Sequence, residues 1–200
     1  ITLSAAQVSA AGDPSAGAQK VQTCSVCHGL NGNSVNPVWP KLAGQHAEYT
    51  LKQLQGFKNG GRANPQMTPM ASALSDQDMQ DIAAYYAGQS LQQTPVPASV
   101  DTVTIALGET IYRAGDARSG LPACMACHGP AGSGNPAALY PGLAGQHSAY
   151  TSAQLQAFKT ETRNNDANSM MRNIAGRMSN EEIEAVSLYI QGLAPAIPAE

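Results

Sequence analysis

Every cysteine in this chain lies in one of two copies of the same pentapeptide. Residues 24–28 read CSVCH, and residues 124–128 read CMACH. Two thiols at this spacing can add to the two vinyl groups of one porphyrin, and the histidine that follows is then held beside the iron as an axial ligand. The two copies therefore predict two haem c groups. The residues that would bind them are Cys24, Cys27 and His28 in the first copy, and Cys124, Cys127 and His128 in the second.

Other interpretations of the cysteines explain less. A redox C-x-x-C pair needs a βαβ context, and the sequence has no strand-rich pattern. A single structural zinc would have to join two cysteine pairs from opposite halves of the chain, although each pair has its own histidine. Two disulfides would close very tight loops and leave both histidines without a role.

The pentapeptides belong to a longer internal repeat. Residues 39–46 (WPKLAGQH) match residues 140–147 (YPGLAGQH), and residues 74–78 (LSDQD) match residues 178–182 (MSNEE). The second copy also has an insertion before its cysteines. The chain is 200 residues long, which allows two domains of about 100 residues each. The repeat therefore predicts two homologous domains.

We expect these domains at residues 12–90 and 105–194, joined by a linker at residues 91–104. Pro95 and Pro97 lie in this linker and would stiffen it.

The hydrophobic periodicity of each copy indicates helices, and the alternation typical of strands is absent. A short helix that leads into the first cysteines should begin after Asp13, a good N-cap that is followed by proline. Further helices are expected over residues 46–58 and 75–88. The second of these opens with an approximate capping box that is complete in the other copy. Residues 29–40 and 59–74 are expected to form loops.

Composition limits the classes of protein that the chain can belong to. Lys and Arg total 11 against 14 Asp and Glu, so the basic excess typical of nucleic-acid binding is missing. No apolar run approaches the roughly 20 residues of a transmembrane helix. Aromatic residues make up only 5% of the chain, which leaves a thin side-chain core that haem groups would fill.

The helix order around C-x-x-C-H resembles class I cytochrome c, and the tandem arrangement is similar to the di-haem cytochrome c4 family over nearly the whole chain. The resemblance implies an all-α fold of two tandem class I cytochrome c-like domains, each wrapped around one haem near the domain interface. Gly17 and Gly108 occupy positions where this fold brings the first and last helices of a domain close together. The aromatic residue expected four positions later is Tyr112 in the second copy but Val21 in the first, which leaves the first crossing less well specified.

Each iron needs a second axial ligand, and methionine is the usual one in cytochromes c. Met67 and Met171 occupy equivalent positions in the loop ahead of the last helix, where the cytochrome c4 family has its ligand. We predict that both are iron ligands. The neighbouring Met70 and Met170 are the alternatives.

His46 and His147 offer another pair of ligands, because they recur in the same Gly-Gln-His sequence. Each lies at the expected start of a helix, where a polar surface residue is ordinary, so ligation by two histidines is the weaker hypothesis.

The resemblance also implies residues around each haem. Pro40 and Pro141 would accept a hydrogen bond from the haem histidine through their carbonyls, and Leu42 and Leu143 would pack on the haem. The alternative is that each proline simply ends a loop.

A haem with both axial positions filled by protein is suited to electron transfer, so we expect an electron carrier and not an enzyme. Covalent haem attachment of this kind occurs outside the bacterial cytoplasmic membrane, and residues 8–10 (VSA) resemble the end of a signal peptide. We therefore expect a periplasmic protein, soluble or peripherally attached to the membrane.

The expected partners are redox proteins: a copper protein or a membrane cytochrome complex as donor, and a terminal oxidase as acceptor. The chain itself is expected to be a monomer or a weak dimer. The alternatives are a di-haem peroxidase, which would need one five-coordinate haem, and the cytochrome subunit of a larger dehydrogenase.

Overall fold

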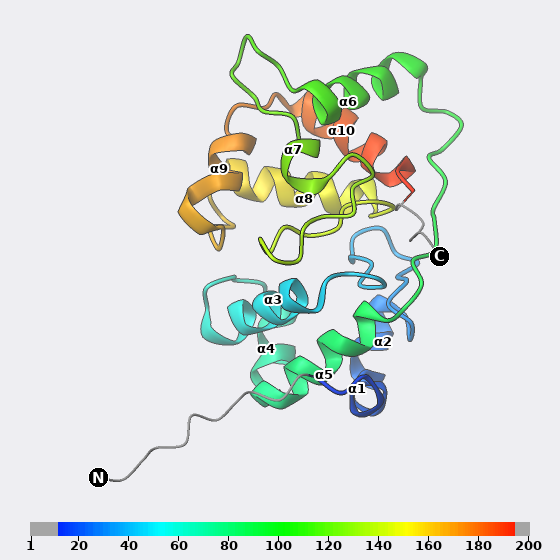
Figure 1. Cartoon of the computed structure of the whole chain (residues 1–200), viewed down its shortest axis with the longest axis vertical. Helices are drawn as coiled ribbons and strands as arrows, with labels where there is room; N and C mark the ends of the chain where they lie inside the picture. The colour runs from blue at the N-terminus through cyan, green and yellow to red at the C-terminus, as the bar shows by residue number, and fades with distance from the viewer. Residues whose placement is uncertain (1–11, 195–200) are drawn as a thin grey trace.

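The computed structural model describes residues 12–194. The expected end of a signal peptide at residues 8–10 lies outside the described residues. Two helical halves lie one above the other, and the linker runs along one side of the molecule (Figure 1). Between residues 12 and 194 the structure has no strand and only isolated β-bridges. None of the described helices is long and apolar enough to cross a membrane.

The helices of the two halves follow the same order. The first half contains α1 (Pro14–Lys20), α2 (Gln22–His28), α3 (Ala47–Asn59), α4 (Met67–Ser72) and α5 (Asp76–Ala87). The second half contains α6 (Thr102–Ala114), α7 (Met125–His128), α8 (Ser148–Lys159), the 3-10 turn η1 (Ala167–Ser169), α9 (Met170–Ala175) and α10 (Asn180–Gly192).

Most of the expected helices of the first half are confirmed, with two corrections. The N-terminal segment is not one helix, because the backbone leaves the helical conformation at Val21 and divides it into α1 and α2. The expected loop at residues 59–74 contains α4, which is too short to show a hydrophobic period and is anchored by the fully buried Ala71. The capping boxes at Ser75 and Ser179 are both complete.

Glycines allow the first and last helices of each half to cross in close contact. A Cβ atom on Gly17 of α1 would lie 2.1 Å from the backbone oxygen of Asp81 in α5. A Cβ atom on Gly108 of α6 would lie 2.2 Å from the backbone oxygen of Ala185 in α10. The two crossings are therefore equally close, and the expectation that the first is less well specified is wrong.

The aromatic residue missing from α1 is replaced from the opposite helix. Val21 packs in the first core against the fully buried Tyr86 of α5. In the second core Tyr112 of α6 is the fully buried aromatic, and Ile190 of α10 lies at the position equivalent to Tyr86. Each core thus contains one aromatic and one smaller aliphatic side chain at the crossing. The aromatic residue comes from the last helix in the first half and from the first helix in the second half.

The insertion in the second half forms a closed loop between α6 and α7. Asp116 and Leu121 exchange backbone hydrogen bonds of 2.9 Å in both directions, and the Leu121 side chain is buried in the second core. The insertion therefore adds apolar contacts ahead of the helix that ends at His128, and this helix has 4 residues where its counterpart α2 has 7.

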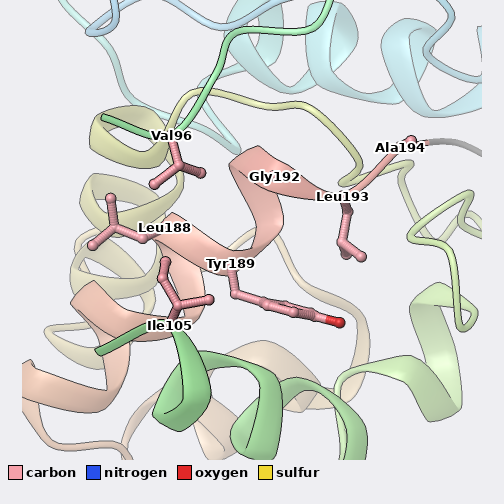
Figure 2. A pocket seen from close by; sticks show the side chains of 7 residues that line it. All are labelled: Val96, Ile105, Leu188, Tyr189, Gly192, Leu193 and Ala194. Atoms are coloured by element: carbon pink, nitrogen blue, oxygen red, sulfur yellow. The ribbon is translucent and has the colours of Figure 1, made fainter. Parts of the chain in front are cut away.

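The linker is hydrogen-bonded to both halves. The Lys41 ammonium donates to the Gln92 carbonyl and to Thr94 Oγ1, and Gln191 Nε2 donates to the Pro95 carbonyl at 2.9 Å. An apolar cavity of about 260 Å³ lies where Val96 of the linker meets α6 and α10 (Figure 2). No cysteine, histidine or methionine lines this cavity, so it is separate from the sites described next.

Candidate functional site

His28 is the last residue of α2 and is buried. Its Nδ1 lies 2.9 Å from the Pro40 carbonyl oxygen, which can only accept, so Nδ1 carries the proton and Nε2 is the nitrogen that remains for a metal. Burial lowers the pKa of His28, and the hydrogen bond to Pro40 opposes this shift only in part. The ring is therefore neutral at neutral pH, the form that ligates iron.

The second half repeats this arrangement at His128, the last residue of α7. Its Nδ1 lies 3.0 Å from the Pro141 carbonyl oxygen. Burial lowers the pKa of His128 as well, against the opposing effect of the Pro141 hydrogen bond. Although α7 is shorter than α2, both histidines are thus held neutral with the same nitrogen free.

The four cysteine side chains are half-buried, and none forms a disulfide. Cys24 and Cys27 lie in the same helix as His28, and Cys124 and Cys127 lie beside or within α7. Burial raises the pKa of Cys24, and it raises the pKa of Cys124 to about 11. Within residues 12–194 no three His, Cys, Asp or Glu side chains gather in a way that could hold a metal ion.

Met67 shares a cavity with Cys24, the first cysteine of the first pair. The cavity has a volume of about 180 Å³ and is lined by Met67, Cys24 and the apolar side chains of Leu54 and Ile82. Met67 is half-buried, whereas the alternative Met70, which also lines the cavity, is 49% exposed. A thioether and a vinyl-reactive thiol in one apolar cavity fit a covalently attached haem.

Met171 lies at the matching position of the second half. A fully buried alanine follows each methionine four residues later, Ala71 after Met67 and Ala175 after Met171. The alternative Met170 corresponds to Gln66, the residue just before α4. The structure therefore keeps Met67 and Met171 in register, and their ligation of iron stays a prediction.

Leu42 and Leu143 also lie in equivalent environments. Each packs against the same core cluster as the first cysteine of its own half. Each donates a 2.7 Å backbone hydrogen bond to a glycine carbonyl in the loop after the C-x-x-C-H pentapeptide, Gly32 in the first half and Gly132 in the second. Each Pro-x-Leu segment is thus hydrogen-bonded at both of its ends. Its proline carbonyl accepts from the haem histidine, and its leucine N–H donates to the loop after the pentapeptide.

His46 and His147 do not take part in this arrangement. His46 Nε2 lies 2.8 Å from the Ser133 carbonyl oxygen, and His147 Nε2 lies 2.8 Å from the Ser34 carbonyl oxygen. Both hydrogen bonds join one half to the other. Each ring is therefore used at the domain interface, which argues against ligation of iron by two histidines.

A second set of interface residues was not found from the sequence. Arg62 and Arg163 are both buried and lie over phenylalanine rings of their own halves. Their guanidinium groups donate to side chains of both halves, namely Gln53, Gln154, Tyr49 and Tyr150. These residues recur at equivalent positions of the two copies, and this recurrence was the available signal.

The two halves thus present the same thiols, neutral imidazole and thioether at equivalent positions, which is the donor set of a c-type haem. The class of protein that this fold and these sites define is a c-type cytochrome with two haems.

Comparison with known proteins gives the same class and narrows it. The family model described as cytochrome c matches the chain twice, over residues 14–88 and 105–194. Cytochrome c4 of Thiocapsa roseopersicina is 51% identical over 185 residues, which cover 92% of this chain and 94% of the relative. The crystal structure of reduced cytochrome c4 from Pseudomonas stutzeri has a TM-score of 0.87 and 45% identity, and covers 92% of this chain and 100% of that chain.

A third relative has a more specific name. The thiosulfate dehydrogenase electron acceptor of Stutzerimonas stutzeri (strain A1501) is 41% identical over 171 residues, which cover 83% of this chain and 76% of the relative.

The chain belongs to the cytochrome c4 family. It carries two haem c groups and is an electron carrier, not an enzyme. The expected all-α fold of two cytochrome c domains is confirmed.

Proposed function

We propose that this chain is a periplasmic electron relay in which each iron is held between an imidazole and a thioether. His28 and Met67 are the ligands in domain 1, and His128 and Met171 are the ligands in domain 2. The thioether links to haem come from Cys24, Cys27, Cys124 and Cys127. Each haem, when bound, supplies reversible one-electron chemistry at its iron.

The observation that carries this proposal is the pair of hydrogen bonds from His28 to Pro40 and from His128 to Pro141, at 2.9 and 3.0 Å. Each bond fixes the imidazole ring and its tautomer, so that Nε2 is aimed at one place in both oxidation states. Leu42 packs against the same core cluster as Cys24, and Leu143 packs against the same core cluster as Cys124. A site held in this way can change its charge with little rearrangement.

An optical redox titration of the purified protein tests the ligation. We expect two haems per chain and the weak long-wavelength band that a sulfur ligand gives to ferric haem. Met67→Ala and Met171→Ala should each remove about half of this band, because each removes one of two thioethers. The matched controls Met70→Leu and Met170→Leu should keep it. Ready binding of carbon monoxide by the native reduced protein would contradict the proposal.

The partners we propose are a copper protein or a membrane cytochrome complex as donor and a terminal oxidase as acceptor. The relative that is named an electron acceptor of a dehydrogenase supports a role in receiving electrons from another protein. The first hundred residues carry equal numbers of basic and acidic side chains, whereas the second hundred have an acidic excess. This difference supports two docking ends that bind different partners.

Stopped-flow oxidation of the reduced chain by a purified terminal oxidase tests the role of acceptor. We expect rapid oxidation by the oxidase and no turnover with hydrogen peroxide and a model donor. Peroxide turnover would favour the peroxidase alternative. Co-elution of the native chain with a dehydrogenase on size-exclusion chromatography would favour the subunit alternative.

A further inference from the structure

The Gly-Gln-His sequence that recurs in both copies places a glutamine from each domain against the backbone of the other. Gln146 Oε1 accepts a hydrogen bond from the Lys41 N–H, and Gln146 Nε2 donates to the Lys41 carbonyl, both at 2.9 Å. Gln45 Oε1 accepts from the Gly142 N–H at 3.0 Å, and Gln45 Nε2 donates to the Gly142 carbonyl at 2.9 Å. Lys41 and Gly142 are equivalent positions, so the contact is reciprocal.

The peptide groups that these glutamines contact are the ones that hold the haem histidines. The Lys41 N–H belongs to the same peptide group as the Pro40 carbonyl, which accepts the proton of His28 Nδ1. The Gly142 N–H likewise shares a peptide group with the carbonyl of Pro141, the acceptor for His128. A continuous hydrogen-bonded path therefore leads from each imidazole, through one peptide group, to a side chain of the opposite domain.

Each glutamine is also held in place within its own domain. Gln45 Oε1 accepts from the His46 N–H at 3.0 Å, and Gln146 Oε1 accepts from the His147 N–H at 3.1 Å. The imidazoles of His46 and His147 then bind serine carbonyls across the interface. The glutamine amides are therefore held by a bond within their own domain, and the next residue along the chain is bonded to the opposite domain.

Hydrogen bonds that share a peptide group strengthen one another, because an acceptor on the N–H side increases the partial charge of the carbonyl oxygen. A stronger carbonyl acceptor makes the haem histidine a more basic ligand, which favours ferric iron. We propose that Gln45 and Gln146 are positioning residues by which each domain lowers the reduction potential of the haem in the other. This inference rests on the proposed ligation of iron by His28 and His128.

The test compares Gln146→Met and Gln45→Met in the full-length protein with both haems attached. Methionine keeps the approximate size of glutamine and removes its two hydrogen bonds to the opposite domain, together with the one to the following histidine N–H. In Gln146→Met we expect the potential of the domain 1 haem to rise more than that of the domain 2 haem. In Gln45→Met we expect the reverse. NMR signals of the two haems assign each potential, and the Nδ1–H resonance of the opposite histidine should shift in the same variant.

Further variants separate this effect from general loosening of the interface. His46→Asn removes the hydrogen bond to the Ser133 carbonyl and should leave the difference between the two potentials unchanged. Gln146→Glu keeps an acceptor for the Lys41 N–H. It should lower the potential of the domain 1 haem relative to that of the domain 2 haem, which is the opposite of the shift expected in Gln146→Met.

Equal shifts at both haems, a larger shift in the variant's own domain, or unchanged potentials would overturn the inference. Failure of the proposed ligation would be seen separately, as a missing sulfur-to-iron band in the unmodified protein.

Discussion

The crossing of the first and last helices has the same backbone geometry in both domains but different side-chain chemistry. In domain 1 the ammonium of Lys20 lies 2.7 Å from Asp78 and 2.6 Å from the buried Asp81. The positions of Lys20 and Asp81 are taken in domain 2 by Ile111 and Ala185, which are buried and apolar. The close glycine contact therefore defines the crossing, and its surroundings are free to be ionic or apolar.

The aromatic residues at the crossings differ in a similar way. The Tyr112 hydroxyl donates to the Gly129 carbonyl at 2.7 Å. The Tyr86 hydroxyl is buried and has no hydrogen-bond partner among the described residues. Burial raises the pKa of Tyr86, and the nearby Cys24 adds to the shift without meeting hydrogen-bond geometry. Both cores thus fill the crossing with a tyrosine ring, but among the described residues only the Tyr112 hydroxyl of the second core has a hydrogen-bond partner.

The largest loss of stability is expected from substitution of the crossing glycines, which the two domains share. Gly17→Ala and Gly108→Ala should each lower the free energy of unfolding of their own domain by about 3 kcal/mol, because the new methyl group meets backbone that must move. Denaturant unfolding followed by haem absorbance measures this loss. Gly88→Ala is the matched control, since its Cβ atom would meet nothing closer than 3.6 Å. Normal stability of either crossing variant would contradict this account.

The next effect tests the ionic character of the first crossing. Lys20→Ile leaves Asp81 buried without its cation and should lower the free energy of unfolding of domain 1, by less than Gly17→Ala because Lys20 is partly exposed. Lys20→Ile combined with Asp81→Ala installs the domain 2 residues and should recover most of this loss. Thermal unfolding of both variants gives the comparison. Equal destabilisation by the single and double variants would be the contrary result.

Acid should weaken the crossing of α1 and α5 in domain 1. Hydrogen bonds from Lys20 are the largest cause that holds the pKa values of Asp78 and Asp81 below their usual range. A carboxyl whose pKa is lower in the folded state adds stability above its unfolded pKa of about 3.9, and this stability is lost as the pH falls through the folded value.

Unfolding at a series of pH values below 5, with the haem signals of each domain followed by NMR, tests this expectation. The Lys20→Ile, Asp81→Ala double variant should reduce the acid sensitivity of domain 1. An unchanged acid response of domain 1 in the double variant would contradict this expectation.

The smallest effect concerns the tyrosine hydroxyls. Tyr112→Phe removes the hydrogen bond to the Gly129 carbonyl, which keeps its other bond from the Gly132 N–H at 3.1 Å, and should cost about 1 kcal/mol. Tyr86→Phe removes a hydroxyl without a partner among the described residues and should be neutral or slightly stabilising. Denaturant midpoints of the two variants measure the difference. A larger loss for Tyr86→Phe would show that its hydroxyl has a partner once haem is attached.

Several features of the fold could not be read from residue patterns. The short α4 has too few residues to show a period, and it is held by burial of Ala71. The replacement of an α1 aromatic by Tyr86 depends on which helix faces the gap at Val21. The last helices were predictable because their capping boxes involve residues only three positions apart.

The sequence by itself determined the chemistry of the cofactor. Two thiols and a histidine in five consecutive residues act through covalent and coordinate bonds whose spacing is local, and duplication repeats them. Only the tertiary structure decided how the domains meet. The Lys41 N–H and the Gln146 amide lie 105 positions apart, and no periodic pattern in the sequence predicts their contact. Their pairing depends on backbone groups brought together by folding, which a reading of side-chain types cannot show.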